Sequence, residues 1–180
     1  RRHHILGVVS SDAAIKRWAK NRAIAHAEPT DNVVAFLRER PFDYLFSIVN
    51  SAILPKEVLG LPDKYAINYH DALLPKYGGT HATSWAIMGR EIRHGVTWHV
   101  MSEVVDAGDI LKQLSVEIAE RDTALTLNAK CYDAAVQAYD DLIDDLSCGR
   151  TSRKKQDLAE RSFFPRYKRP PVAGVFSWQR

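Results

Sequence analysis

An asparagine and a histidine stand two positions apart at the end of a short apolar segment, Tyr65–His70 (YAINYH). Residues two apart in a β-strand face the same side, so Asn68 and His70 would point together. In open α/β sheets, ligands bind at the carboxyl ends of strands. An amide N–H can donate to a developing oxyanion, and an imidazole can transfer a proton near neutral pH. The pair suits acyl transfer, although an N-x-H pattern alone also fits a hydrogen-bonded polar pair without chemistry.

A carboxylate in a later turn is the second candidate. The segment Val105–Asp109 (VDAGD) contains Gly108, which permits unusual backbone dihedrals, and it lies between two predicted strands. Asp106 can therefore reach a neighbouring strand end, where a carboxylate would raise the basicity of an imidazole and fix its orientation. The alternative is a simple turn whose aspartates bind local N–H groups, which is our interpretation of Asp109.

Apolar runs and helix signals alternate along the chain and must position these groups. Strands are predicted at Ile5–Ser10, Ile24–Ala27, Phe42–Val49, Tyr65–His70, Gly95–Met101 and Asp109–Ile118. Helices are predicted at Ala13–Asn21, from a cap at Thr30 or Asp31 to Arg40, after Pro55, at His81–Met88, and from a cap at Asp122 or Thr123 to about Leu146. The alternation predicts an α/β fold with a wound, mainly parallel sheet flanked by helices.

Composition narrows the class of protein. The 180 residues are 46% hydrophobic, which is enough for a buried core, and the net charge of +3 selects no polyanionic partner. The basic residues gather after Gly149, where the pattern changes to a charged segment with aromatic residues and prolines. We therefore predict a catalytic domain at residues 1–149, a basic linker at 150–171, and the start of a C-terminal module at 172–180.

Location and cross-linking also have sequence signals. Two scattered cysteines, Cys131 and Cys148, do not make a disulfide framework. No apolar run approaches the ~20 residues needed to span a bilayer, and the short apolar stretch after the N-terminus is too small for a signal peptide. These features predict a cytoplasmic protein that does not enter a membrane.

The motifs together are more specific than each alone. The run Ile67–Leu111 (INYHDALLPKYGGTHATSWAIMGREIRHGVTWHVMSEVVDAGDIL) resembles the formyltransferase family, with its Asn-x-His, Leu-Leu-Pro loop, Gly-Val-Thr strand and Asp-x-Gly turn. The resemblance implies a Rossmann-like fold and transfer of a formyl group from 10-formyltetrahydrofolate to an amine. Carried over by position, Asn68 would hold the formyl oxygen, His70 would assist transfer, and Asp106 would hold or relay protons.

The resemblance also places the folate co-substrate. The pterin ring would meet backbone groups in the stretch after the strand at Phe42–Val49 and in the loop before Asp106. The implied folate-binding residues are Asn50, Ser51, Ala52, Ile53 and Leu54 on one side, and Met101, Glu103 and Val105 on the other. Core packing is the alternative for Ile53 and Leu54.

The acceptor is less sharply indicated. Two segments look most like the formylation domains of nonribosomal peptide synthetases: the sequence NYHDALLPKYGGTHATSWAI and the tail from Gln156 to Pro170. Those domains act on an aminoacyl group held on a carrier protein. Sugar-amine N-formyltransferase and methionyl-tRNA formyltransferase are alternatives. Asp71 departs from the family pattern and could contact the acceptor amine or cap a turn.

The sequence offers less support for functions of other classes. The histidines lack metal-binding spacing, so no metal is expected, and His94 and His99 are interpreted as surface or strand positions. Nucleic-acid binding by the basic tail is not favoured, because no RNA-binding motif accompanies it. A formyltetrahydrofolate hydrolase or a non-catalytic docking domain stays open, although the intact Asn68, His70 and Asp106 argue against docking alone.

The beginning of the chain carries one more expectation. The family usually has another strand and helix before Ile5, and the residues Arg1–His4 look like the end of that helix. A sheet lacking this strand would expose unpaired edges, so we expect a gap of ~4.8–10 Å between the strands at Ile5 and Phe42. Direct pairing of these two strands would contradict the idea.

Overall fold

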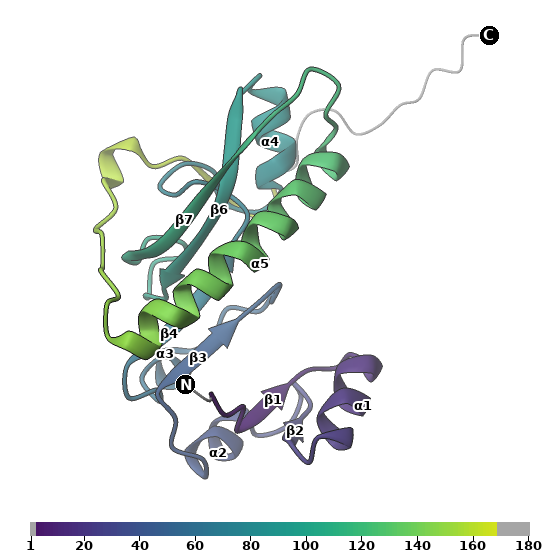
Figure 1. Cartoon of the computed structure of the whole chain (residues 1–180), viewed down its shortest axis with the longest axis vertical. Helices are drawn as coiled ribbons and strands as arrows, with labels where there is room; N and C mark the ends of the chain where they lie inside the picture. The colour runs from purple at the N-terminus through teal and green to yellow at the C-terminus, as the bar shows by residue number, and fades with distance from the viewer. Residues whose placement is uncertain (1–2, 169–180) are drawn as a thin grey trace, which may run out of the picture. The chain divides into compact units, whose positions relative to one another are not determined.

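The computed structural model describes residues 3–168, which form two compact units. The first contains the chain up to Phe46 together with Asn50–Ala66. The second contains Ser47–Val49 and the chain from Ile67 onwards. Figure 1 labels the helices and strands of both units.

The first unit starts with a parallel β-α-β element. Strand β1 (Gly7–Val9) pairs in parallel with β2 (Ala25–Ala27), and helix α1 (Ala13–Asn21) connects them. The Asp12 carboxylate accepts hydrogen bonds from the backbone N–H groups of Ala14 and Ile15, so Asp12 is the N-cap of α1. The helix therefore begins and ends where its sequence pattern indicated.

The second helix of this unit is shorter than predicted. Helix α2 spans Val33–Arg38, and its cap is Asn32, whose side chain accepts from the Ala35 N–H. The predicted caps Thr30 and Asp31 are wrong, since Asp31 instead accepts from the Glu28 N–H in the preceding turn. Strand β3 (Tyr44–Ser47) and helix α3 (Lys56–Leu59), capped by Pro55, follow.

A four-stranded sheet carries the polar residues of interest. Its order is β3-β4-β6-β7, where β4 is Tyr65–His70, β6 is Arg93–Val100 and β7 is Ile110–Glu117. The β4–β6 and β6–β7 pairs are antiparallel, so the α/β sheet system is mixed, with parallel pairing in β1–β2. The short link between β6 and β7 explains the antiparallel pairing, because a parallel return needs a crossover of a dozen or more residues.

Two helices belong to this second unit. Helix α4 spans Ala82–Met88, and helix α5 spans Ala124–Cys148. Thr123 and Thr126 form a capping box at the start of α5, and Gly149 ends it with a left-handed φ of 64°. Helix α5 packs along β6 and β7 (Figure 1) through a stripe of buried side chains that includes Leu127, Cys131 and Leu142.

The basic segment after α5 is described as far as Lys168. It turns back from the end of α5 (Figure 1), forms a β-bridge from Lys154 to Ile110 and a 3-10 turn at Leu158–Glu160. It then forms strand β8 (Phe163–Phe164), which pairs in parallel with β5 (Gly78–Gly79). Neither short strand was predicted. The proposed module at 172–180 lies outside the described residues, and the domain division remains a prediction.

Two further expectations concern a strand before β1 and a membrane-spanning helix. Strands β1 and β3 belong to different sheets of the described chain, and the idea of a preceding strand stays a prediction. Within residues 3–168, no helix has both the length and the apolar character that a bilayer crossing requires.

The α5 interface yields the first prediction. Leu142 is fully buried, so Leu142→Ala should lower the free energy of unfolding by about 2–5 kcal/mol through lost apolar contact and a residual cavity. Val136, on the same helix, is 63% exposed, and Val136→Ala should change it by less than about 0.5 kcal/mol. Urea unfolding measures both. Equal effects of the two substitutions would contradict this packing of α5.

Candidate active site

Strand pairing brings the Asn68 amide to a histidine from another strand. In the antiparallel β4–β6 pair, Asn68 stands directly opposite His99, so the two side chains share a face. Asn68 Nδ2 lies 3.3 Å from His99 Nε2, and His99 Nδ1 lies 3.0 Å from the Val100 carbonyl oxygen. A carbonyl only accepts, so Nδ1 carries the proton in the neutral ring. The Asn68 amide then donates to His99 Nε2.

Asp106 occupies a strained and buried position in the β6–β7 turn. Its φ is 54°, in the left-handed region that non-glycine residues rarely adopt, and only 8% of the residue is exposed. The Gly79 N–H donates to Asp106 Oδ2 over 2.8 Å. Gly108 is required nearby, because a Cβ there would lie 1.8 Å from the Val100 carbonyl oxygen. The turn is thus packed directly against the end of β6.

The His70 ring lies between a carbonyl and two carboxylates. Its Nε2 is 2.9 Å from the Tyr77 carbonyl oxygen, to which it donates. Its Nδ1 is 3.7 Å from Asp106 Oδ2 and 3.9 Å from Asp71 Oδ1. The Nδ1 atom faces negative charge on two sides, so this nitrogen is the one placed to exchange a proton.

The three predicted catalytic residues therefore meet. Asn68 and Asp106 both lie beside His99, since His99 Nε2 is 3.5 Å from Asp106 Oδ1. His70 is on the same strand as Asn68 and faces the other carboxylate oxygen of Asp106. One amide, two imidazoles and one carboxylate thus form a continuous polar cluster at the end of β4.

Asp106 is held as a carboxylate. Burial raises its pKa, but the nearby His99 side chain, the charge of His70 and the Gly79 N–H together outweigh burial and lower it to about 2. The group is therefore ionised at neutral pH and can receive a proton during a reaction only by way of a strong donor.

His99 is a functional candidate that the sequence interpretation missed. Both His94 and His99 lie in strand β6, but they are buried, with exposed fractions of 1% and 2%, so a surface position is wrong. Burial lowers the pKa of His94, whose Nε2 donates to the Asp71 carbonyl oxygen. The available signal for His99 was the even spacing of Gly95, Thr97 and His99 in one strand, which places them on one face.

The predicted folate contacts divide between the two units. The stretch from Asn50 to Leu54 belongs to the first unit, where Asn50 Oδ1 accepts from the Ala52 N–H and Ile53 is 82% exposed. Met101, Glu103 and Val105 belong to the loop after β6 in the second unit. The exposure of Ile53 does not fit the core-packing alternative. The folate contacts themselves stay a prediction.

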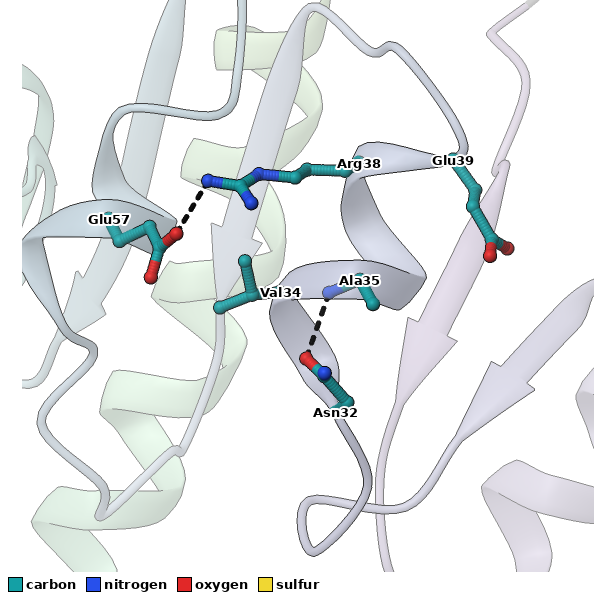
Figure 2. Close-up of a pocket in the computed structure, with 6 residues that line it drawn as sticks. All are labelled: Asn32, Val34, Ala35, Arg38, Glu39 and Glu57. Atoms are coloured by element: carbon teal, nitrogen blue, oxygen red, sulfur yellow. Dashed lines mark hydrogen bonds and ion pairs between the residues drawn. The ribbon is translucent and has the colours of Figure 1, made fainter.

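A separate hollow lies on the first unit. Figure 2 shows its lining around α2, where Arg38 forms an ion pair with Glu57. Its other lining residues are Asn32, Val34, Ala35 and Glu39. None of them belongs to the polar cluster. In the part of the chain that the structure describes, no three histidine, cysteine or acidic side chains gather as metal ligands.

Comparison with known proteins identifies the family of this chain. The family model for formyl transferases matches residues 7–143. The chain belongs to the formyl transferase family. The matched residues include Asn68, His70, His99 and Asp106, so the polar cluster lies within the part of the chain that matches the family.

Solved structures agree with the family. An N-formyltransferase from Helicobacter canadensis, in complex with folinic acid and dTDP-3-aminofucose, is 25% identical, with a TM-score of 0.75, over 86% of this chain. A phosphoribosylglycinamide formyltransferase from Bacillus halodurans is 26% identical, with a TM-score of 0.71, over 79% of this chain and 80% of its own. A phosphoribosylglycinamide formyltransferase from Anaplasma phagocytophilum, 23% identical, shows the same fold, with a TM-score of 0.75, over 91% of this chain and 86% of its own.

The extent of the match differs among these relatives. The chain spans 55% of the length of the Helicobacter canadensis protein. It shares with that protein the formyl transferase fold.

The Asp106 charge generates a prediction about pH. A carboxyl group whose pKa is lower in the folded chain than in the unfolded chain stabilises the fold when it is ionised. For Asp106, this stabilisation is fully present at pH values above the unfolded pKa near 3.8, and it is lost as the pH falls towards the folded pKa of about 2. Wild-type protein should therefore lose about 2 kcal/mol more stability than Asp106→Asn across this window. Urea unfolding at several pH values between 6 and 2 measures the difference. Parallel pH dependences for the two proteins would contradict the buried, ionised Asp106.

Proposed function

We propose that this chain transfers the formyl group of 10-formyltetrahydrofolate to a primary amine. The observation that carries the proposal is the convergence of Asn68, His70 and Asp106 in one buried cluster, with the carboxylate ionised. Amine formylation needs a donor for the oxyanion that develops on the formyl oxygen and an acceptor for the proton that the amine releases. The cluster contains one amide donor, Asn68, and two groups that can take up a proton, His70 and Asp106.

Asn68 is the proposed oxyanion donor. A side-chain amide has two N–H bonds, and His99 Nε2 accepts one of them. This hydrogen bond fixes the amide orientation and leaves the second N–H to bind the formyl oxygen. A donor fixed before the reaction needs no rearrangement as charge develops, and such donors are typically worth ~10²–10³ in rate.

His70 and Asp106 are the proposed proton-transfer groups. The acceptor amine must lose a proton as its nitrogen bonds to the formyl carbon. His70 Nδ1 and the carboxylates of Asp71 and Asp106 surround the position where that proton can be received. The half-buried Asp71 would also attract the amine in its ammonium form.

The donor set fits a formyl-folate co-substrate, since an amide donor and an imidazole beside a carboxylate serve acyl transfer without a metal. When bound, the folate supplies the formyl carbon. The residues that would hold it are those predicted above, from Asn50 to Leu54 and from Met101 to Val105. We also place the reaction in the cytoplasm, an interpretation supported by Cys131 and Cys148, which form no disulfide.

The acceptor is the finer part of the proposal. The sequence resemblance of the Ile67–Leu111 region favours an aminoacyl group held on a carrier protein of a nonribosomal peptide synthetase. A sugar amine is the second candidate, favoured by the 25% identity to an N-formyltransferase in complex with dTDP-3-aminofucose. Both acceptors present a primary amine, so the same cluster would serve either.

Substitution of the cluster tests the reaction itself. His70→Ala and Asp106→Asn should each lower turnover at least ~10²-fold, because each removes a proton-transfer group, while folate affinity stays within about twofold. His4→Ala and Asp141→Asn change the same residue types at exposed positions and should leave turnover unchanged. Release of tetrahydrofolate measures the rates. If either cluster variant kept more than about a tenth of wild-type turnover, the assignment of roles would be wrong.

A panel of acceptors tests the finer proposal. The protein is incubated with formyl-labelled folate and, separately, with aminoacyl carrier proteins, nucleotide-linked amino sugars, charged initiator tRNA or buffer alone. Label should move to an aminoacyl carrier. Transfer to the amino sugar alone would replace the carrier with the second candidate, and release of formate in buffer alone, with no transfer, would indicate a hydrolase.

A further inference from the structure

The segment after α5 forms hydrogen bonds with the turn that contains Asp106. We call residues 153–164 the strap. Gln156 Nε2 donates to the Asp106 carbonyl oxygen over 3.0 Å and to the Gly108 carbonyl oxygen over 2.7 Å. Arg161 Nη2 donates to the Val105 carbonyl oxygen over 2.9 Å. Three carbonyls of one five-residue turn therefore bind strap side chains.

The same strap holds the partner of the Asp106 carboxylate. Strand β8 pairs with β5, where the Gly78 N–H donates to the Ser162 carbonyl oxygen and the Thr80 N–H donates to that of Phe164, both over 2.9 Å. Between these two bonds, the Gly79 N–H points the other way and donates to Asp106 Oδ2. The alternating pattern of a strand thus aims the Gly79 N–H at the carboxylate.

The contact between strap and loop is too close for any other residue at position 79. A Cβ on Gly79 would lie 2.1 Å from the Phe164 carbonyl oxygen, and its φ of 96° also favours glycine. Tyr77 adds a stacked contact with the Phe164 ring, and its N–H donates to Ser162 Oγ. The strap is therefore fitted to the loop on one side and to the Asp106 turn on the other.

Asp106 needs such support because of its backbone. A left-handed non-glycine residue persists only where its surroundings hold it. Gln156 is suited to this task, since its NH₂ group has two donors and meets two carbonyls of the turn. Gln156 Oε1 is buried and has no hydrogen-bond partner, so the described contacts of this amide are those of its nitrogen.

We propose that Gln156 is a positioning residue for catalysis, which fixes the Asp106 carboxylate relative to His70 and Asn68 through the backbone of the 105–109 turn. Its effect on turnover rests on the proposed function. The hydrogen bonds of Gln156 go to the backbone of the 105–109 turn, so its proposed effect on the reaction passes through Asp106. The basic segment, on this view, is part of the catalytic machinery of the second unit.

The experiment compares Gln156→Met, which keeps the side-chain length and removes both donors, with Gln137→Met at an exposed position of α5. Gln156→Met should lower kcat about 10- to 100-fold with KM for formyl-folate within about twofold, because a displacement of about 1 Å costs up to ~10²-fold. Gln137→Met should match wild type. Gln156→Asn keeps the amide but reaches one carbonyl at most, and it should lie between the two.

Amide NMR of the same proteins separates this inference from the proposed function. In Gln156→Met, the Gly79 amide should shift and exchange its hydrogen at least about tenfold faster, as its bond to Asp106 loosens, while amides of α5 stay unchanged. This result would support positioning even if no acceptor were formylated. Unchanged Gly79 signals, or kcat within twofold of wild type in an active protein, would overturn the role of Gln156. Loss of protection throughout α5 would also overturn it, since Gln156 would then hold the fold as a whole.

Discussion

The buried charge of Asp106 is the constraint on which the rest of the site depends. A carboxylate out of water is costly unless it is paired and hydrogen-bonded. Here its partners come from three places in the chain: His70 on β4, His99 on β6 and the Gly79 N–H on β5. Those elements must therefore assemble before the charge can be accommodated. The left-handed backbone at Asp106 adds to this demand, which the close approach at Gly108 and the Gln156 amide help to meet.

The predictions that succeeded rest on local physics. Strand β4 has the predicted bounds, Tyr65–His70. Asn68 and His70 face the same side because side chains alternate along a strand, and this inference needs no knowledge of the fold. The start of α5 was predicted at a cap of Asp122 or Thr123, and Thr123 is the cap. The helix runs two residues past the predicted end near Leu146, to Cys148 before Gly149. The Asp106 turn was visible because a carboxylate beside Gly108 lies between two apolar runs. Local signals of this kind indicated Asn68, His70 and Asp106 as candidates, and their catalytic roles stay a prediction.

The features that the sequence did not reveal are non-local or involve the backbone. His99 enters the site because β6 pairs antiparallel to β4 in a register that places it opposite Asn68, and register depends on the whole sheet. The strap was interpreted as a basic linker because its composition is charged. However, several strap side chains bind main-chain carbonyl oxygens. Every residue has such a carbonyl, so no residue type in the sequence marks the partner. The cap of α2 at Asn32 shows a smaller version of the same limit, since several adjacent polar residues were equally suitable.

His99 links the two halves of the proposed chemistry. Its Nε2 faces both the Asn68 amide and Asp106 Oδ1, and one nitrogen can direct only a lone pair or a proton. With a lone pair there, Asn68 donates to His99 and its second N–H is oriented. With a proton there, the hydrogen bond goes to Asp106, and the Asn68 NH₂ group must turn away. Because Nε2 can serve only one of these neighbours at a time, the orientation of the Asn68 amide and the contact between His99 and Asp106 are linked through a single atom.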